Sequence, residues 1–485
     1  MEKVKRFLFS NINANQIVIK NTLWLLIGEI AMRLLKMALI IYAARKLGAD
    51  GWGIFSYAIS TASLLMIFSD IGISSLITRE VAKKNEGYKE FLSASLFLKG
   101  IISIISIILV LSIAPSLSNI KEANVLFPII AFILFFDSIR DIGLAINRAL
   151  EKMERETIIK IIMGLSILIF GFILIKINPI PTSMATAYLI GSALGLILII
   201  FILRKNIRGF IIKVNMKSLG LVIRTTLPFA MITLVGGILV NTDIFMLGIW
   251  RTPEDIGIYS ISQRFYQFIL IIPSMIATAT LPVMSRLANE NMEKFKIFTE
   301  KIFYIFMIVA IPIIIGGIML MDQIVPLIFG LEYLRAIPVL KILIVMLFVS
   351  FPLTLLTNSI LVFNEQRKMI AANIFGVLIN IVINFLLIPK WGVMGATIAT
   401  VISTIVITYI MWYKMKKVNN FRILPVIKKI IIPVVIMISS ILLLGYIKTP
   451  LIINIIISSV LYLGFLFIKE RLIIKEVLSL VTIKE

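Results

Sequence analysis

The sequence contains no cysteine and no histidine. Without thiols the chain cannot form a disulfide or use a thiolate nucleophile, and without imidazoles it lacks the commonest general base and the usual Cys/His metal ligands. Charge is also scarce, because charged residues make up 15% of the 485 residues against about 25% in soluble globular proteins. These absences exclude an ordinary soluble enzyme.

Apolar residues are plentiful instead and account for 60% of the chain. A helix that crosses a bilayer uses roughly 20 of them, so the composition predicts an all-α polytopic membrane protein. Apolar runs broken by short charged or Gly/Pro-containing turns predict about fourteen transmembrane helices. These predicted spans are residues 21–45, 52–78, 91–113, 123–146, 157–177, 181–203, 225–249, 256–285, 297–320, 336–362, 369–388, 392–413, 430–447 and 450–468.

The residues before the first run are polar and basic, with Lys3, Lys5 and Arg6 among them. They lack the adjacent apolar region and cleavage site of a removable signal peptide, so we expect the first apolar run to remain as a helix. The predicted loops are too short to hold an extramembrane catalytic domain. We therefore predict a protein that is not an enzyme, needs no cofactor and acts within or across the bilayer.

The net charge of +23, from 48 Lys and Arg against 25 Asp and Glu, would suggest a nucleic-acid partner in a soluble chain. Assigning the N-terminus and every second loop to the cytoplasm places the large majority of loop lysines and arginines on that side, as the positive-inside rule requires. The charge thus indicates topology and no nucleic-acid partner. It predicts a multi-pass protein of the cell (inner) membrane with both termini in the cytoplasm.

An internal repeat is also visible. Gly53–Tyr57 (GIFSY) recurs 204 residues later as Gly257–Ile261 (GIYSI), after spans one and seven. Since six helices separate the copies, both halves insert in the same sense, which predicts two parallel six-helix lobes around a central cavity. Further matches join Arg155, Gly164 and Ala187 to Arg367, Gly376 and Ala399, and the predicted domains are residues 1–210 (spans 1–6), 211–417 (spans 7–12) and 418–485 (two extra helices and a cytoplasmic tail).

Charges inside the spans carry the functional signal, because one at mid-bilayer costs about 2.5–3.5 kcal/mol on insertion scales. Such residues pair with one another, face water or serve function. Eleven lie within the predicted spans: Glu29, Arg33, Lys36, Asp70, Lys99, Asp137, Arg140, Asp141, Asp243, Arg264 and Lys341.

Glu29, Arg33 and Lys36 share one face of the first span, at spacings of four and seven. One interpretation is a Glu29–Arg33 ion pair that stabilises packing, which leaves Lys36 over. The other is a polar stripe on a water-filled cavity with surplus positive charge, suited to an anionic headgroup. Both remain open at this point.

The fourth span groups Asp137, Arg140 and Asp141 on one face, either as a neutralised network or as a cation-coupling site. Asp243 lies near the outer end of span seven, as an interfacial residue or a second coupling candidate. The remaining polar residues of the spans have these expected roles: Ser260, Arg264 and Gln267 form a polar face on span eight, Asn380 and Asn384 join helices, Asp70 makes a helix-end contact, and Lys99 and Lys341 extend to the interface.

Several segments resemble the polysaccharide biosynthesis proteins of the Wzx type, which are oligosaccharide flippases of the multidrug/oligosaccharidyl-lipid/polysaccharide (MOP) exporter superfamily. The resemblance extends along essentially the whole chain through diffuse motifs. It rests on Ala43–Tyr57, Asp70–Ile73, Thr78–Glu80, Pro273–Pro282 and Gly392–Thr400.

The resemblance implies a flippase that moves a polyprenyl-(pyro)phosphate-linked oligosaccharide from the inner to the outer leaflet by alternating access. It implies a central cavity lined by bases, for which Arg33, Lys36 and Arg264 fit, with Glu29 and Gln267 on the same polar faces. It also implies coupling to H⁺ or Na⁺, for which Asp137, Asp141 and Asp243 are candidates by chemistry alone.

In similar flippases of lipid-linked peptidoglycan precursors the two extra helices hold the lipid tail. We expect the same of the last two spans here, and we expect the protein to act as a monomer among membrane lipids. The alternative within the superfamily is a cation-coupled multidrug or small-molecule antiporter, which the basic cavity and extra helices disfavour. A glycosyltransferase or polymerase would need a long outer loop that the sequence lacks.

Overall fold

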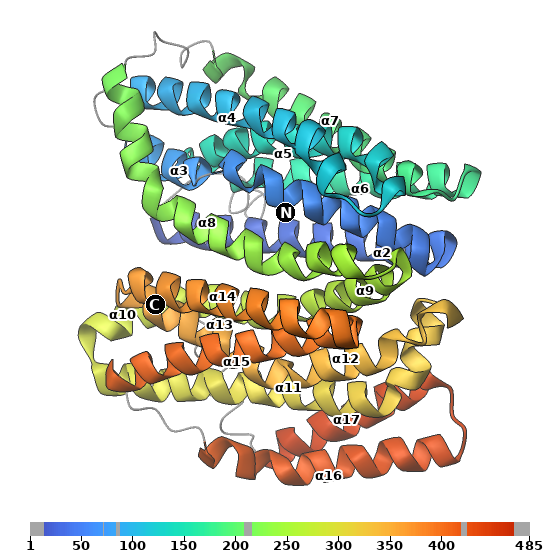
Figure 1. Cartoon of the computed structure of the whole chain (residues 1–485). Helices are drawn as coiled ribbons and strands as arrows, with labels where there is room; N and C mark the ends of the chain where they lie inside the picture. Colours follow the sequence, from blue (N-terminus) through green and yellow to red (C-terminus); the bar gives the residue numbers. More distant parts are fainter. Residues whose placement is uncertain (1–13, 71, 84–87, 208–215, 419–423, 470–485) are drawn as a thin grey trace, which may run out of the picture. The chain divides into compact units, whose positions relative to one another are not determined.

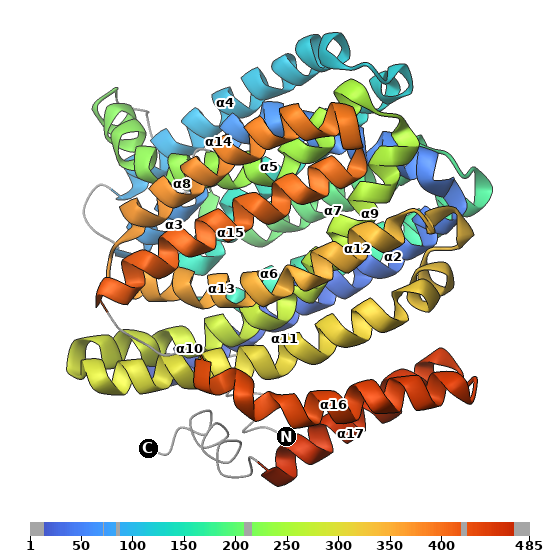
Figure 2. The ribbon, with the colours of Figure 1, turned by 60° about the horizontal axis from the view of Figure 1, so that its bottom comes forward.

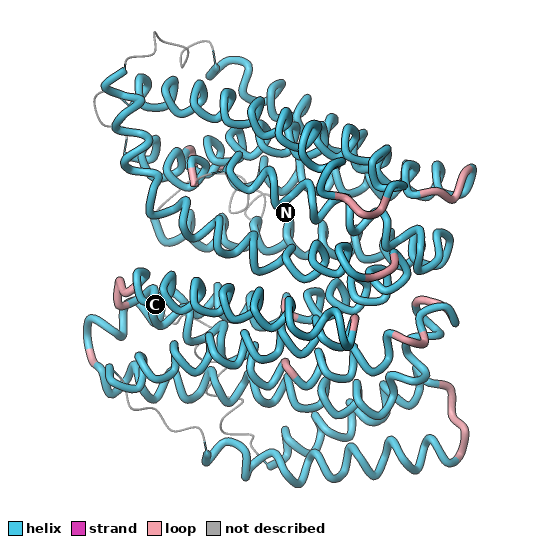
Figure 3. Tube along the Cα trace, in the orientation of Figure 1, coloured by secondary structure: helices cyan, strands magenta, loops and turns pink. Residues whose placement is uncertain are grey.

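Packing divides the protein into two units, which are described separately. A computed structural model describes residues 14–70, 72–83, 88–207, 216–418 and 424–469. Unit 1 comprises Met1–Ile261 with Asn380–Ala396, and unit 2 comprises Ser262–Ile379 with Thr397–Glu485. The described residues form helices joined by short loops, as predicted for an all-α protein (Figures 1 and 3). The predicted basic residues Lys3, Lys5 and Arg6 lie outside these residues.

Unit 1 is built from the first helices of the chain. The first part of α2 packs against α6, α6 packs against α7, and α5 fills the space beside α7. α8 also packs in this unit, against α2, α3 and α4. The helices are α2 (Ala14–Leu65), α3 (Ile73–Lys83), α4 (Tyr88–Leu117), α5 (Leu126–Ala149), α6 (Met153–Ile177), α7 (Pro181–Ile207), α8 (Met216–Trp250) and the first half of α9 (Pro253–Ile269), with short turns η1 (Met66–Asp70) and η2 (Lys121–Val125).

Two glycines end the predicted first and second spans. α2 is two helices joined at Gly48, whose φ of 69° is a left-handed conformation that glycine adopts without strain. The second helix was predicted to reach residue 78, but it ends at Leu65. There the chain passes through η1, with Asp70 at its end, and turns at Gly72, where φ is 77°.

Unit 2 contains the later helices. α11 packs against α10, α12 and α13, and the α16–α17 hairpin packs against α11 (Figure 2). Asn291 caps α11 by accepting hydrogen bonds from the backbone of Glu293 and Lys294. The helices are the second half of α9, α10 (Ile271–Glu290), α11 (Met292–Ile328), α12 (Ala336–Val345), α13 (Leu347–Val362), α14 (Gln366–Trp391, partly in unit 1), α15 (Val393–Val418, partly in unit 1), α16 (Leu424–Tyr446) and α17 (Leu451–Lys469), with η3 (Leu331–Tyr333).

Each of the fourteen predicted spans contains helix. Nine described helices are long and apolar enough to cross a membrane, or ten if α12 and α13, bent by 44°, count as one span. α2, α5 and α16 are not among these helices, and the described apolar part of α16, Ile430–Tyr446, is shorter than the others. The two packing units differ from the predicted six-helix lobes, since α8 packs in unit 1. The lobes remain a prediction, and their first boundary, at residue 210, lies outside the described residues.

The repeated Gly-Ile-aromatic-Ser segments meet inside unit 1. A Cβ atom on Gly53 would lie 1.7 Å from the carbonyl oxygen of Pro253, and one on Gly257 would lie 1.9 Å from that of Ala49. These positions correspond under the repeat, because Ala49 and Gly53 match Pro253 and Gly257. The glycine of each copy therefore packs against the backbone of the other copy. A two-fold relation between the copies produces such a symmetric pair of contacts.

We expect Gly53→Ala and Gly257→Ala to destabilise the protein, since the obstructing atoms belong to the backbone and cannot rotate away. Overpacking of this kind costs about 1–3 kcal/mol. Thermal unfolding of the purified protein in detergent, followed by tryptophan fluorescence, measures the effect.

The matched control is Gly100→Ala in α4, where a Cβ would meet nothing within 4 Å. This variant gains helix propensity of up to about 1 kcal/mol, so its melting temperature should hold or rise. Equal melting temperatures for all three variants would contradict the close crossing.

Candidate functional site

Five charged residues of unit 1 form a continuous series of ion pairs, which we call the charge chain: Arg33, Glu29, Lys160, Glu156 and Arg148. Arg33 and Glu29 are one turn apart on α2, and Nε of Arg33 donates to Oε1 of Glu29 at 2.6 Å. Both side chains are accessible, at 39% and 45% of their full exposure. The predicted Glu29–Arg33 ion pair is thus confirmed, while its functional role remains a prediction.

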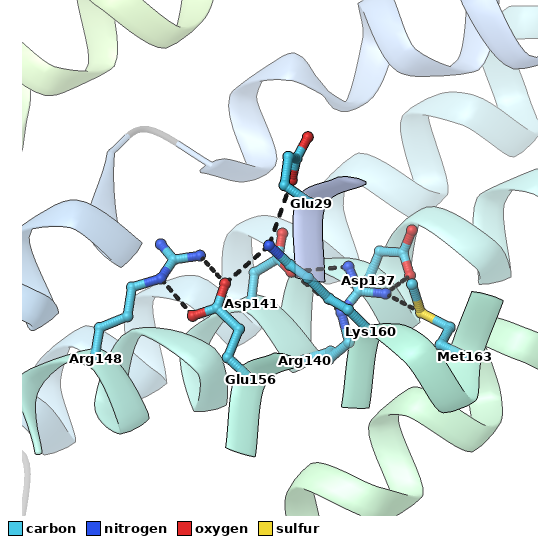
Figure 4. Close-up of polar contacts among 8 residues, drawn as sticks. All are labelled: Glu29, Asp137, Arg140, Asp141, Arg148, Glu156, Lys160 and Met163. Carbon is cyan, nitrogen blue, oxygen red and sulfur yellow. Dashed lines mark hydrogen bonds and ion pairs between the residues drawn. The ribbon is translucent and has the colours of Figure 1, made fainter. Parts of the chain in front are cut away.

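The chain continues from α2 into α6 and α5 (Figure 4). Nζ of Lys160 lies 3.6 Å from Oε2 of Glu29 and 3.0 Å from Oε1 of Glu156. Arg148 donates to both oxygens of Glu156, at 2.7 and 2.6 Å. Because the Glu156 side chain is fully buried, its charge requires these partners.

Residues 148 and 156 lie between the predicted spans 123–146 and 157–177, and residue 160 lies in the first turn of the second span. The structure begins α6 at Met153, four residues before the predicted span, so that Glu156 and Lys160 are one helical turn apart. Their spacing of four was the available signal, since opposite charges at i and i+4 pair on a helix. The site of unit 1 therefore includes three residues beyond the sequence prediction.

A second cluster surrounds Arg140 on α5. Its guanidinium donates to Asp137 at 2.5 Å and to Asp141 at 2.8 Å, and contacts the sulfur of Met163 (Figure 4). Two acids here share one base, whereas the charge chain has three bases and two acids. The Arg140 cluster therefore has one negative charge in excess and the charge chain has one positive charge in excess. Taken together, the two groups are formally neutral.

Lys36 lies one turn beyond Arg33 on α2. Its ammonium stands 5.8 Å from the centroid of the Tyr188 ring on α7, a cation–π geometry. Arg33 and Lys36 therefore place two bases on one polar face. Arg264 and Gln267 are half-buried on the part of α9 that belongs to unit 2. Their predicted grouping with Arg33 and Lys36 stays a prediction.

Asp243 of α8 is buried, with 1% of its surface exposed. Its carboxylate accepts hydrogen bonds from the Tyr259 hydroxyl at 2.5 Å, from Nδ2 of Asn384 at 2.6 Å and from Nδ2 of Asn380 at 3.0 Å. The prediction that the asparagines join helices is confirmed, because they connect α14 to α8. The interpretation of Asp243 as an interfacial residue is wrong, since three side chains enclose it.

The structure corrects the prediction for Lys99 but not the one for Lys341. Lys99 does not extend to the interface but is fully buried, on the face of α4 that carries Ser95 and Ser103. Lys341 of α12 forms an ion pair with Asp322 of α11 at 2.7 Å. Both side chains of this pair are partly exposed, so the predicted extension of Lys341 to the interface stays a prediction.

Unit 2 contains an apolar cavity of about 390 Å³ between α9, α11, α12, α16 and α17. Its polar edge consists of Ser458, Ser459 and Tyr462 of α17. The Tyr462 hydroxyl donates a hydrogen bond to the backbone oxygen of Ile308. The cavity is therefore suited to a hydrocarbon chain. Its apolar wall includes Pro312, Gly316, Leu320, Met437 and Ile455.

The chain is similar to known proteins in sequence and in fold. The family model described as "Polysaccharide biosynthesis protein" matches residues 18–288, and the model described as MatE matches residues 228–386. The chain is 21% identical over 368 residues to the "Probable low-salt glycan biosynthesis flippase Agl15" of Haloferax volcanii, covering 75% of this chain and 76% of that protein. It is 25% identical over 417 residues to the capsular polysaccharide biosynthesis protein CapF of Staphylococcus aureus, covering 82% and 99%.

Two solved structures define the fold. The lipid II flippase MurJ in an inward closed conformation superposes with a TM-score of 0.77 at 20% identity, covering 92% of this chain and 99% of that one. An inward-facing multidrug resistance MATE family transporter of the MOP superfamily gives a TM-score of 0.62 at 18% identity, covering 81% and 98%. The fold is that of the MOP superfamily, and because one family model matches more than half of the chain, the protein belongs to the polysaccharide biosynthesis protein family.

Proposed function

We propose that the protein is a flippase that moves a lipid-linked oligosaccharide from the inner to the outer leaflet of the cell membrane. The observation that carries the proposal is the accessible Arg33, with Lys36 beside it on α2. Guanidinium and ammonium groups bind phosphate, and an organic cation would need the opposite charge. Family membership and the names of the relatives Agl15 and CapF support the same function.

The carrier in this proposal is a polyprenyl phosphate or pyrophosphate. The apolar cavity beside α16 and α17 supports it, because a long hydrocarbon tail needs a dry surface while its headgroup crosses. The transport step is alternating access by a monomer with both termini in the cytoplasm. No bond of the substrate is broken, so the protein acts as a transporter and not as an enzyme.

Transport in this proposal is coupled to a cation at Asp243, ahead of Asp137 and Asp141 as candidates. The two aspartates of α5 already share a guanidinium, whereas the Asp243 carboxylate accepts hydrogen bonds from a hydroxyl and two side-chain amides. Oδ1 of Asn384 is also buried and accepts no hydrogen bond from the described residues. A carboxylate with an amide oxygen nearby suits a proton or a hard cation such as Na⁺.

The combined variant Arg33→Gln, Lys36→Gln and Arg264→Gln is expected to lower flipping by at least about tenfold, the equivalent of one charge-assisted hydrogen bond. The measurement is the appearance of a fluorescent polyprenyl-pyrophosphate oligosaccharide in the outer leaflet of proteoliposomes. A membrane-impermeant quencher reports its position.

The control removes three exposed bases elsewhere, Lys121→Gln, Arg286→Gln and Lys294→Gln. It should flip at the rate of the unmodified protein. Full activity of the first variant with intact folding would overturn the assignment of these bases to the substrate.

Asp243→Asn is expected to abolish the acceleration of flipping by an imposed Na⁺ or pH gradient, because an amide keeps the shape but cannot bind a proton or neutralise a cation. Asp322→Asn, at an exposed aspartate, should leave the gradient dependence intact. Persistence of the gradient effect in Asp243→Asn, with its loss in Asp137→Asn or Asp141→Asn, would move the coupling site to α5.

A further inference from the structure

Glu29 stands between two bases that differ in accessibility. One carboxylate oxygen accepts from Arg33 at 2.6 Å, and the other faces Nζ of Lys160 at 3.6 Å. The Arg33 side chain is 39% exposed and that of Lys160 is 21% exposed. The carboxylate therefore bridges an accessible base and a more enclosed one.

Lys160 is held from the opposite side. It lies closer to Glu156, at 3.0 Å, than to Glu29, and Glu156 is itself fixed by the two hydrogen bonds from Arg148. The inner end of the charge chain is thus anchored in α5 and α6. Arg33 forms the outer end of the charge chain. Within the charge chain as the structure describes it, Arg33 contacts the other members only through the Glu29 carboxylate.

The Glu29–Arg33 pair does not belong to the lipid-facing side of α2. The exposed apolar residues Leu23, Ile27 and Leu34 lie on a different face of the helix from Glu29 and Arg33, at 100° of rotation per residue. A charged pair that is nearly half accessible faces water rather than hydrocarbon. Arg33 can consequently be reached by a dissolved or membrane-anchored anion.

A transporter that alternates between two sides must reorient both loaded and empty. In the loaded form a bound phosphate compensates Arg33 and Lys36. In the empty form an uncompensated guanidinium would have to move through a low-dielectric region, which is unfavourable. Glu29 supplies a negative charge at that place.

We infer that Glu29 is a built-in substitute for the substrate's phosphate. The inference rests on the proposed function and adds a competition to it: the arriving phosphate displaces the Glu29 carboxylate from Arg33, and Lys160 retains that carboxylate until the phosphate leaves. Glu29 then returns to Arg33 and neutralises the empty site. In this scheme Lys160 is a positioning residue, since it acts on the substrate through Glu29.

Binding of geranylgeranyl pyrophosphate to the purified full-length protein, measured by calorimetry in detergent at constant ionic strength, tests the competition. Glu29→Gln should bind the probe about tenfold more tightly, because a charge-assisted hydrogen bond no longer competes for Arg33. Its multiple-turnover flipping in proteoliposomes should be slower, since the empty form lacks its neutralising charge.

Lys160→Met should have the opposite effect on affinity, because Glu29 then stays on Arg33. The double variant of Glu29→Gln with Lys160→Met should bind like Glu29→Gln alone, which a purely structural role for Lys160 would not produce. Glu29→Asp, whose shorter side chain draws the carboxylate back from Arg33, gives an intermediate affinity and replaces Glu29→Gln if that variant does not fold. Glu365→Gln, in the exposed pair with Lys368, is the matched control and should bind normally.

The outcomes separate the two proposals. If the unmodified protein binds the probe and Arg33→Gln abolishes binding, but Glu29→Gln binds equally or more weakly, the substitute role of Glu29 is wrong and the proposed function stands. If the unmodified protein does not bind the pyrophosphate at all, the proposed function fails and this inference fails with it. Tighter binding with slower turnover in Glu29→Gln supports both.

Discussion

The cost of placing an ionised side chain in a low-dielectric medium governs the arrangement of polar groups in this protein. Water cannot compensate a charge inside a helix bundle, so the compensation must come from a neighbouring side chain. The structure meets this requirement in three ways. The charge chain alternates bases and acids across three helices, Arg140 holds two aspartates, and Asp243 is surrounded by a hydroxyl and two amides.

These forms of compensation suit opposite ligands. In the charge chain each acid contacts two bases, so one contact can be exchanged for an incoming anion without leaving an acid bare. Around Asp243 a hydroxyl of α9 and two side-chain amides of α14 donate hydrogen bonds to the carboxylate. In the proposed function the first arrangement binds phosphate and the second binds a proton or a metal cation. Both groups lie within unit 1.

Sequence patterns predicted the helices well, because an apolar run long enough to cross the hydrocarbon core has few structures open to it other than a helix. The Glu29–Arg33 pair was also predictable, because residues four apart on a helix lie side by side. The contacts of Asp243 were out of reach, since Asn380 and Asn384 are 137 and 141 residues away and only tertiary packing brings them together. Glu156 was assigned to a loop because a charged first turn lowers local hydropathy, although α6 includes it. The break at Gly72 was missed because apolar composition continues through it.

The close crossing of Gly53 and Gly257 also has a consequence for biosynthesis. The backbone that packs against Gly53 lies about 200 residues later in the sequence. At roughly 5–20 residues per second, it is synthesised roughly 10–40 s after Gly53. During this interval the first half of the chain is in the bilayer while the backbone at Gly53 has no packing partner from the second half. The backbone surface around Gly53 is therefore accessible to other membrane components at this stage of synthesis. Insertion of the second half then covers this surface.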